Sequence, residues 1–272
     1  MIRASSAIIV SRADPAGMTI KQVLLKLYPF KERNGHYWYS DIPLIEIEKP
    51  TIYADELEKI VEADLYVFAT RHASESGFPA LLTHPPGNWT DRADLGGKPR
   101  SICIAPAYAL KVAALTLREW HEKLGLEGWR VGIEVTHHGP YLEKTPALFV
   151  ELGSTEAEWR NEKAAIAVAH AAVRVAVSGL NFNPGWVPAV GFGGPHYAPR
   201  FLKHVFGDYY AIGHIIPIYA FDDVREREIR MAFERTYPRP RVALLDWKGL
   251  RKPHKEKLLL ALEDMGVEVV RA

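Results

Sequence analysis

Short runs rich in valine and isoleucine alternate along this chain with longer segments of helical periodicity. The short runs are bounded by glycine, proline or aspartate, which is typical of buried strands. We predict strands at 7–10, 65–69, 101–105, 131–136, 147–151, 187–191, 211–218, 242–245 and 267–270. We predict helices at 19–27, 108–124, 155–177, 224–233 and 254–265. This alternation indicates an α/β fold with a largely parallel sheet that helices cover on both faces.

The helix predicted at 155–177 has the clearest boundaries. Thr155 and Glu158 form a capping-box pattern at its start, and Gly179 follows its end. Its body is rich in alanine, so we expect it to pack on more than one side. In open α/β sheets, ligands bind in loops beyond the carboxyl ends of the strands. Polar residues in those loops are therefore the candidates for function.

The composition is that of a globular protein. Apolar residues make up 48% and charged residues 25% of the 272, which is enough for a buried core. No apolar stretch approaches the roughly 18 residues of a membrane span, and the first residues do not resemble a signal peptide, so we expect no membrane partner. Cys103, the single cysteine, excludes an internal disulfide framework and a thiolate-rich zinc site, and it fits a reducing cytosol.

Positive charge is concentrated in one segment although the net charge is only +1. The 225–257 segment has 11 Lys and Arg residues against 5 Asp and Glu residues. Such a segment is either a set of solvated helix faces or a surface that contacts nucleic-acid phosphates.

Several of the 11 histidines lie at or just after predicted strand ends. They are His72, His84, His137, His138 and His196, with His214 inside a further strand and the carboxylates Glu134 and Glu151 near two of the same ends. No HExxH motif is present, so a metal site must be assembled from separate loops, and imidazole ligands suit zinc. The alternative for any one histidine is a structural role in which it donates to a backbone carbonyl.

The pair His137-His138 stands directly before Gly139-Pro140. Adjacent strand residues point to opposite faces, so both rings can serve one ion only if they have left the strand. Thr136 or Gly139 could provide that departure.

The 190–196 loop, VGFGGPH, contains three glycines that permit positive φ and close approach of a ligand to the backbone. Its amides could bind a carbonyl oxygen or a phosphate, or the loop could be a turn without function. The chain has no G-x-G-x-x-G fingerprint and no phosphate-binding P-loop, so nucleotide binding is not indicated. The stiff 84–89 segment, HPPGNW, is either a lid over a pocket or an ordered turn.

Taken together, seven motifs resemble the archaeal-type D-aminoacyl-tRNA deacylases, a family shared by archaea and plants. The motifs are ATRHAS (69–74), HPPGNW (84–89), APAYAL (105–110), EVTHHGP (134–140), FVELGSTEAEW (149–159), VGFGGPHYAPRF (190–201) and GHIIPIY (213–219). The resemblance extends from about residue 5 to residue 270.

The resemblance implies hydrolysis of the ester that joins a D-amino acid, such as D-tyrosine, to the 3′ end of tRNA. This reaction is a chiral proofreading step that recycles mischarged tRNA. The resemblance also implies a zinc-dependent, cytoplasmic monomer with no obligate protein partner. Its fold is expected to be a three-layer α/β/α sandwich, phosphorylase/hydrolase-like, formed by one deacylase domain of residues 1–272.

The resemblance also suggests roles for individual residues. We expect catalytic roles for His72, His137, His138, Glu151, Gly193 and Gly194, with the two glycine amides stabilising an oxyanion. Zinc ligands are expected among His137, His138, His196 and Glu151. Substrate contacts are expected from His84, Trp89, Tyr197 and Arg200, with Trp89 or Tyr197 stacking on the terminal adenosine and the 225–257 segment contacting the acceptor stem.

Three alternatives stay open at this point. An aminoacyl ester is already activated, so a site without metal is possible. The same loop-borne residues would permit a zinc peptidase or amidase, and the basic segment would permit a non-catalytic RNA-binding protein.

Overall fold

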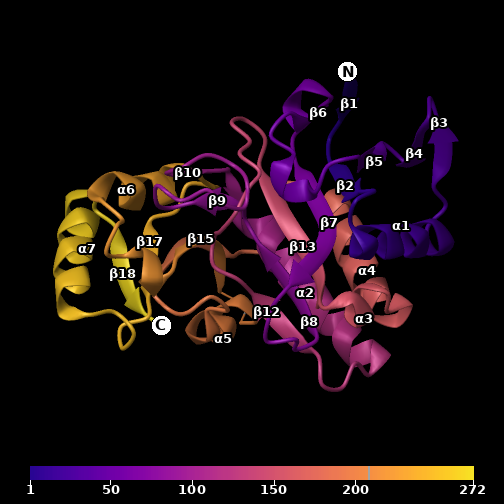
Figure 1. The fold of residues 1–272 in the computed structure, drawn as a ribbon. Helices are drawn as coiled ribbons and strands as arrows, with labels where there is room; N and C mark the ends of the chain where they lie inside the picture. Colours follow the sequence, from indigo (N-terminus) through magenta and orange to yellow (C-terminus); the bar gives the residue numbers. More distant parts are fainter. Residues whose placement is uncertain (208) are drawn as a thin grey trace.

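The protein is built around two main β-sheets in a computed structural model that describes residues 1–207 and 209–272. Within these residues, the large sheet has eight strands and the small sheet has four. The large sheet has the order β12 (Arg130–Ile133), β8 (Ala80–His84), β13 (Ala147–Ser154), β7 (Tyr66–Ala73), β2 (Ala7–Ser11), β5 (Ile42–Ile47), β4 (His36–Tyr39) and β3 (Lys31–Arg33). The small sheet has the order β15 (Tyr210–Ile216), β14 (Val187–Phe192), β17 (Val242–Leu245) and β18 (Glu268–Arg271). Figure 1 shows the small sheet at one end of the molecule and the β3–β4 hairpin at the other.

The strand directions confirm the mixed, largely parallel sheet that the sequence predicts. The pairs β13–β7, β7–β2 and β2–β5 at the centre of the large sheet are parallel. Strand β8 runs antiparallel to β13, and β3 to β5 form antiparallel pairs at the far edge. Every neighbouring pair of the small sheet is parallel.

The helices begin and end where local sequence signals place them. They are α1 (Pro15–Leu27), α2 (Ala107–Leu124), α3 (Glu156–Trp159), α4 (Glu162–Ser178), α5 (Leu202–Val205), α6 (Glu226–Glu234) and α7 (Lys252–Asp264). The capping box of Thr155 and Glu158 is present, but it opens only the short α3. Asn161 then caps α4 by accepting from the Ala164 amide at 3.0 Å, so the single helix predicted at 155–177 is two. In the part of the chain that the structure describes, no helix combines the length and the apolar character that crossing a bilayer requires.

The two faces of the large sheet differ. Val67, Leu148 and Val150 point to one face, where they share a core with α1, α2 and α4. Phe68 and Phe149 point to the other face, where their rings stack at 4.7 Å. Over the described residues, this second face is covered by loops and 3₁₀ turns and has no long helix, unlike the two-sided covering that the alternation predicts. A polar site therefore has room on this face.

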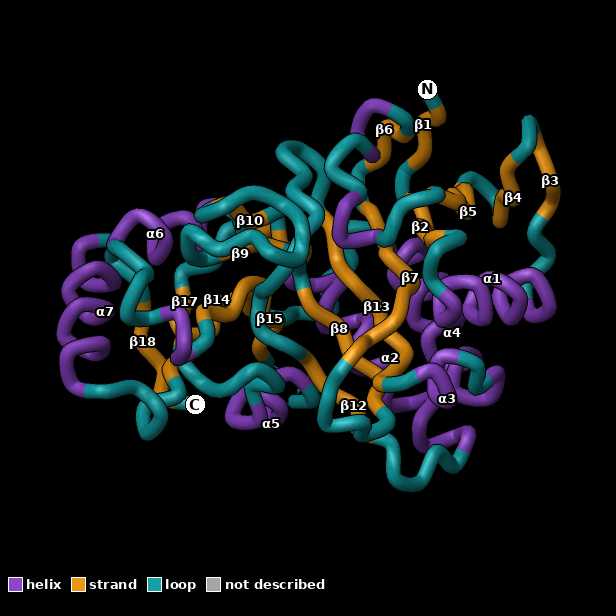
Figure 2. Tube along the Cα trace, viewed as in Figure 1, coloured by secondary structure: helices purple, strands orange, loops and turns teal. Residues whose placement is uncertain are grey.

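The small sheet lies between two helical layers. Val190 and Leu245 pack on α6 and α7, whereas Ala189 and Leu244 face α2 and α5. Here the expected three-layer arrangement is present, because parallel strands bury both faces. The short ribbon of β9 (Gly87–Asn88) and β10 (Ser101–Ile102) lies above β14 and β15 of the small sheet in the view of Figure 2.

Some strand boundaries differ from the prediction in places that matter for the site. The strand predicted at 131–136 ends at Ile133, and the strand predicted at 211–218 ends at Ile216, before Pro217. Strand β8 is not predicted from the sequence, because its five residues lie between two prolines and it becomes a strand by pairing with β12 and β13. The predicted strand 101–105 is divided between β10 and β11 (Ala105–Pro106).

Candidate active site

Four polar side chains meet on the face of the large sheet that is turned away from the helices. His72 comes from β7, His84 from the end of β8 and Glu151 from β13, and side-chain alternation brings all three to this face. Glu134 directly follows β12, and its amide still donates to the Thr83 carbonyl at 3.2 Å. All four side chains are buried. The sheet register therefore assembles a buried set of two imidazoles and two carboxylates.

A glycine on β13 makes room for His72. Gly153 is the register partner of His72, and a Cβ at this position would collide with the His72 carbonyl oxygen and Cβ. The His72 ring lies close to the strand, and its Nδ1 is 3.2 Å from Glu151 Oε2 and 3.4 Å from Glu134 Oε1. One imidazole is thus placed between two carboxylates.

The adjacent residues His137 and His138 both face the same place. Strand β12 has ended before them, and His138 has a φ of 44°, in the left-handed region. Their ring centroids are 4.3 Å apart, and they lie 4.2 and 4.8 Å from the ring of His84. Two neighbouring residues can face one ion only if they have left the strand. This condition is met, because the strand ends before His137 and the backbone turns at His138.

The small sheet contributes His196, which follows β14. Its Nε2 donates to Glu134 Oε1 at 2.7 Å, and its carbonyl accepts from the Val135 amide at 3.0 Å. Its ring centroid is 4.5 Å from that of His137. The structure thus brings His72, His84, His137, His138 and His196 together around Glu134 and Glu151, from four strands of two sheets.

Hydrogen bonds decide the charge of His72 and Glu134. Burial opposes the protonated form of His72, but hydrogen bonds to Glu134 and Glu151 outweigh burial and raise its pKa to about 11. Burial also opposes the charge of Glu134, yet hydrogen bonds from His196 and His72 hold the pKa of this carboxyl well below its usual range. Near neutral pH, His72 is therefore an imidazolium and Glu134 a carboxylate.

His137 and His138 have the opposite charge state. Burial, together with the neighbouring imidazole of His84, lowers the pKa of His137 well below its usual range and the pKa of His138 to about 4. Both rings are neutral near pH 7, so each retains one nitrogen with a free lone pair.

The donor set fits a metal ion. In His137 and His138, Nδ1 donates to the carbonyl of Val135 or Gly139 at 2.8 and 2.6 Å, which leaves Nε2 free as a ligand. In His84, Nδ1 lies 3.2 Å from the Pro85 carbonyl and Nε2 contacts Glu151 Oε1 at 3.4 Å, so a metal ion on this ring would replace the contact with Glu151. Donor atoms of these three residues lie within 4.8 Å of one another. The same holds for the set Glu134, His137 and His196, and for the set His72, Glu134 and Glu151. Nitrogen and oxygen donors without sulfur are compatible with zinc.

One buried atom of the site has no partner. Glu134 Oε2 lies in a side chain that is 0% exposed, and no hydrogen bond reaches it from the described residues. Its nearest ion-pairing atom is His84 Nε2, at 3.9 Å. A buried carboxylate oxygen without a partner is costly, so a cation or a water molecule beside it would relieve that cost.

Two of the expected substrate contacts have different surroundings. The Tyr197 hydroxyl lies 3.2 Å from His72 Nε2 and donates to Ser74 Oγ at 3.0 Å, so this residue belongs to the site. Arg200 is exposed on the 3₁₀ turn Pro199–Phe201.

Trp89 does not offer the open stacking face expected of it. It is 4% exposed, and its ring packs edge-on against His214 at 5.6 Å. His214 has a structural role, since its Nε2 donates to the Cys103 carbonyl at 2.9 Å and its Nδ1 accepts from Thr136 Oγ1 at 2.9 Å. His214 is fully buried, whereas Trp89 still lines the cavity of about 280 Å³ that leads to His137 and His138.

The glycine loop has the predicted conformation but differs in its hydrogen bonds. Gly193 and Gly194 have φ values of 93° and 83°, which glycine adopts at low cost. The Gly193 amide donates to the Ile216 carbonyl at 2.8 Å and is therefore engaged, which argues against the oxyanion role expected for it. Within the described residues, the Gly194 amide has no acceptor and is free for a ligand.

Two adjoining cavities of about 280 and 260 Å³ lead to His137 and His138. Both are also lined by Asn88, Arg92 and Tyr219. The Tyr219 hydroxyl donates to His196 Nδ1 at 3.4 Å. The expected site residues do not include Glu134 or Tyr219, although Glu134 stands at a predicted strand end and Tyr219 ends the GHIIPIY motif.

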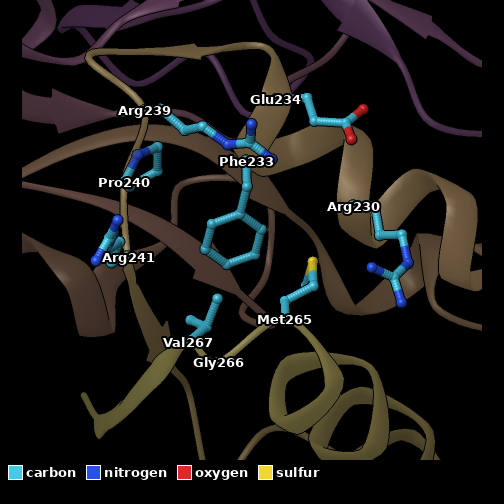
Figure 3. A pocket seen from close by; sticks show the side chains of 9 residues that line it. All are labelled: Arg230, Phe233, Glu234, Arg239, Pro240, Arg241, Met265, Gly266 and Val267. Carbon is cyan, nitrogen blue, oxygen red and sulfur yellow. The ribbon is translucent and has the colours of Figure 1, made fainter.

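Part of the basic 225–257 segment lines a separate cavity, whereas its residues Asp246 and Leu250 pack against the glycine loop. Figure 3 shows a cavity of about 650 Å³ with Arg230 and Phe233 of α6 on one side, Arg239 and Arg241 on another, and the turn before β18 below. Arg241 precedes β17, so this cavity lies at the amino ends of the small sheet's strands. His196 follows the carboxyl end of the parallel strand β14, so the cavity and the site are at opposite edges of the small sheet.

The family model for D-aminoacyl-tRNA deacylase matches residues 60–270. This chain belongs to the D-aminoacyl-tRNA deacylase family. The resemblance to this family that the seven motifs indicate is therefore confirmed.

Relatives of this family member match over nearly the whole chain. The D-aminoacyl-tRNA deacylases of Thermococcus kodakarensis and Caldivirga maquilingensis are each 34% identical, over 97% of this chain and 98% of their own. A crystal structure described as "Conserved Protein of Unknown Function AF0625" is similar with a TM-score of 0.89 and 30% sequence identity. This similarity covers 98% of this chain and 95% of the other.

Proposed function

We propose that this chain hydrolyses the ester that joins a D-amino acid, for example D-tyrosine, to the 3′ end of tRNA. The products are the free D-amino acid and tRNA, so the reaction recycles mischarged tRNA and acts as chiral proofreading. One observation carries the proposal: in a member of the D-aminoacyl-tRNA deacylase family, five imidazoles and two carboxylates meet beside cavities that lead to His137 and His138. Its relatives in two archaea bear the name of this activity.

Hydrolysis of the ester needs a base for the attacking water and a proton for the departing ribose oxygen. His72 cannot be the base, because its pKa of about 11 keeps it protonated. Glu151 takes the proton of the water and then delivers it to the departing ribose oxygen. The imidazolium of His72 holds Glu134 and Glu151 in place and supplies positive charge near the developing oxyanion. The free amide of Gly194 can add a hydrogen bond to that oxygen.

Zinc is the proposed cofactor. Either His84, His137 and His138 or Glu134, His137 and His196 would hold it, because the donor atoms of each set lie within 4.8 Å of one another, and Glu151 lies beside them. A bound zinc ion would polarise the ester carbonyl or acidify a water molecule. His72 and His196 orient the Glu134 carboxylate by hydrogen bonds to Oε1. This leaves Oε2 as the oxygen that could bind the metal.

The proposed partner is the acceptor end of a tRNA that carries a D-amino acid. Tyr197, Arg200 and His84 stay candidates for contacts with it. Because charged tRNA is used in translation, we place the reaction in the cytoplasm and expect a monomeric enzyme.

One assay tests the proposal. The protein is incubated with D-Tyr-tRNA, L-Tyr-tRNA and a panel of peptides, with and without a chelator. We expect release of D-tyrosine and no release of L-tyrosine or cleavage of peptides. Peptide cleavage would instead favour a zinc peptidase or amidase, and binding of tRNA without release of either amino acid would favour a non-catalytic RNA-binding protein.

A further inference from the structure

Two exposed apolar side chains flank the cavity through which His137, His138 and His196 are reached. Leu95 is 57% exposed and Tyr219 is 59% exposed, and both line the same cavity of about 260 Å³. Apolar and aromatic side chains that line a cavity together with a few polar groups are typical of a ligand-binding site.

Both side chains belong to segments that are fixed relative to the candidate active site. The Leu95 carbonyl accepts from the Gly139 amide at 3.0 Å, which ties the loop between β9 and β10 to the His137-His138 segment. Tyr219 lies in the 3₁₀ turn Ile218–Ala220, and its hydroxyl donates to His196 Nδ1. The opening is therefore lined by an aliphatic and an aromatic side chain at fixed positions.

We propose that Leu95 and Tyr219 hold the adenine base of the tRNA's terminal nucleotide between them, with Tyr219 stacking on one face of the base and Leu95 covering the other. This inference rests on the proposed deacylase function. Stacking on an aromatic ring uses the π-face of a base and needs no base-edge hydrogen bonds. Stacking of this kind does not distinguish one base from another, and it therefore suits a nucleotide that is the same in every tRNA substrate.

The position of the base follows from the covalent structure of the substrate. The ester is on the ribose of that same nucleotide, so the base must lie about one sugar away from the reacting carbonyl. Tyr219 meets this requirement, because it contacts His196, and His196 donates to Glu134 in the middle of the site. Arg92 lines both cavities, but its guanidinium is paired with Asp94 at 2.8 Å, so no phosphate contact is assigned to it.

Kinetics with three substrates that share one acyl group test the proposal. The substrates are D-tyrosyl-tRNA, D-tyrosyl-adenosine and D-tyrosine ethyl ester, which lacks the nucleoside. We expect Tyr219→Ala to lower kcat/KM roughly tenfold to a hundredfold on the first two substrates, mainly through KM, because a base stacked on an aromatic ring contributes that much. Hydrolysis of the ethyl ester should change less than about twofold, which also shows that the variant is folded and its catalytic groups are intact.

Matched variants sharpen the test. Tyr219→Phe keeps the ring and loses the contact with His196, so it should retain most of the activity on D-tyrosyl-adenosine. Leu95→Ala should lower kcat/KM on the nucleoside substrates by a smaller factor than Tyr219→Ala. Tyr209→Ala removes a tyrosine of equal exposure, 60%, that lines neither cavity, and should have no effect.

Three results would overturn the inference. Unchanged hydrolysis of D-tyrosyl-adenosine by Tyr219→Ala would exclude stacking. An equal loss on the ethyl ester would show that the ring acts through His196 and not through the base. Both results leave the proposed function standing, whereas an unmodified protein that releases D-tyrosine from none of the three substrates removes the function, and the adenine site with it.

Discussion

Glu134 Oε1 accepts a hydrogen bond from His196 Nε2 at 2.7 Å, and this bond joins the two sheets of the protein. Glu134 follows β12 at the edge of the large sheet, and His196 follows β14 of the small sheet. The same oxygen faces His72, while the second oxygen of the carboxylate is buried and has no hydrogen-bond partner among residues 1–207 and 209–272. A buried charge in this arrangement is expensive for the fold, which is typical of groups retained for function.

Replacing Glu134 tests its place at the centre of the site. Glu134→Gln keeps the shape of the side chain but removes its charge. We therefore expect kcat on D-Tyr-tRNA to fall at least about a hundredfold. A loss of this size is typical when a group that transfers a proton or supports metal binding is removed. Steady-state kinetics and metal analysis measure the effect. Glu127→Gln, an exposed matched change, should leave both unchanged. Full activity of Glu134→Gln would show that this carboxylate is only structural.

The histidine pair is tested by single substitutions. His137→Ala and His138→Ala each remove a neutral ring whose Nε2 is free, and we expect each to lower activity at least about a hundredfold and to reduce bound zinc. His36→Ala, on the distant β4, is the control and should change activity less than about twofold. A loss of the same size in all three variants would contradict the assignment of the site.

His254 is a poor control for that experiment, although it lies in the basic segment. It is 5% exposed, and its Nε2 donates to Asp222 Oδ1 at 2.9 Å. We expect His254→Ala to lower the free energy of unfolding without a specific loss of activity, because it removes a buried packed side chain.

Removal of metal should affect stability as well as activity. Dialysis against a chelator should abolish release of D-tyrosine, and added zinc should restore it. Because zinc would bind the folded protein in preference to the unfolded chain, zinc at a hundredfold excess over its Kd should raise the free energy of unfolding by about 3 kcal/mol. Thermal unfolding with and without zinc measures this change. Full activity of metal-free protein would favour hydrolysis that depends only on the protein's own residues.

Acid should destabilise the fold through His214. Burial lowers its pKa to about 3, so the folded protein leaves this ring neutral while the unfolded chain protonates it below about pH 6.5. The unfolded state therefore binds more protons between these values, and stability present above pH 6.5 is lost as the pH falls, by about 1.4 kcal/mol per unit for this residue. Urea unfolding between about pH 4 and pH 6 measures how the free energy of unfolding changes with pH. This slope should be smaller by that amount in His214→Gln than in the unmodified protein. An identical slope in both proteins would contradict the prediction.

The basic cavity of Figure 3 provides a test of the tRNA footprint. Because it lies at the edge of the small sheet opposite His196, we expect the double variant Arg239→Ala/Arg241→Ala to change kcat/KM on D-Tyr-tRNA less than about twofold. A tenfold loss, together with a weaker salt dependence of binding, would show that tRNA phosphates reach this cavity.

Much of the fold could be predicted from local sequence signals. The bounds of β17 are predicted in full, and the capping box predicted at Thr155 is present, although it opens the short α3 and not one long helix. Four strands of the large sheet, β8 and the neighbouring β5, β4 and β3, are not predicted, and β8 becomes a strand only through pairing on both sides. Hydrophobic periodicity cannot report such pairing, because a partner distant in the sequence supplies the hydrogen bonds.

The candidate site could be predicted only in part. Histidines at strand ends are visible in the sequence, and His72, His137, His138 and His196 do lie together. Glu134 and Tyr219 are not expected as members, because their roles come from a hydrogen bond and a cavity formed across the two sheets. The stacking face expected from Trp89 is lost for the same reason, since its burial depends on His214 in another strand.

The sequence by itself determined the α/β class, the family and the residue types available for chemistry, because strand periodicity, capping and extended motifs are local properties of the chain. Only the tertiary structure decided which face of the large sheet is polar, that His72 is charged while His137 and His138 are neutral, and that Glu134 lies at the centre. Burial and charge at each of these residues depend on neighbours that folding brings from more than 50 positions away, as in the Glu134–His196 and His72–Glu151 contacts.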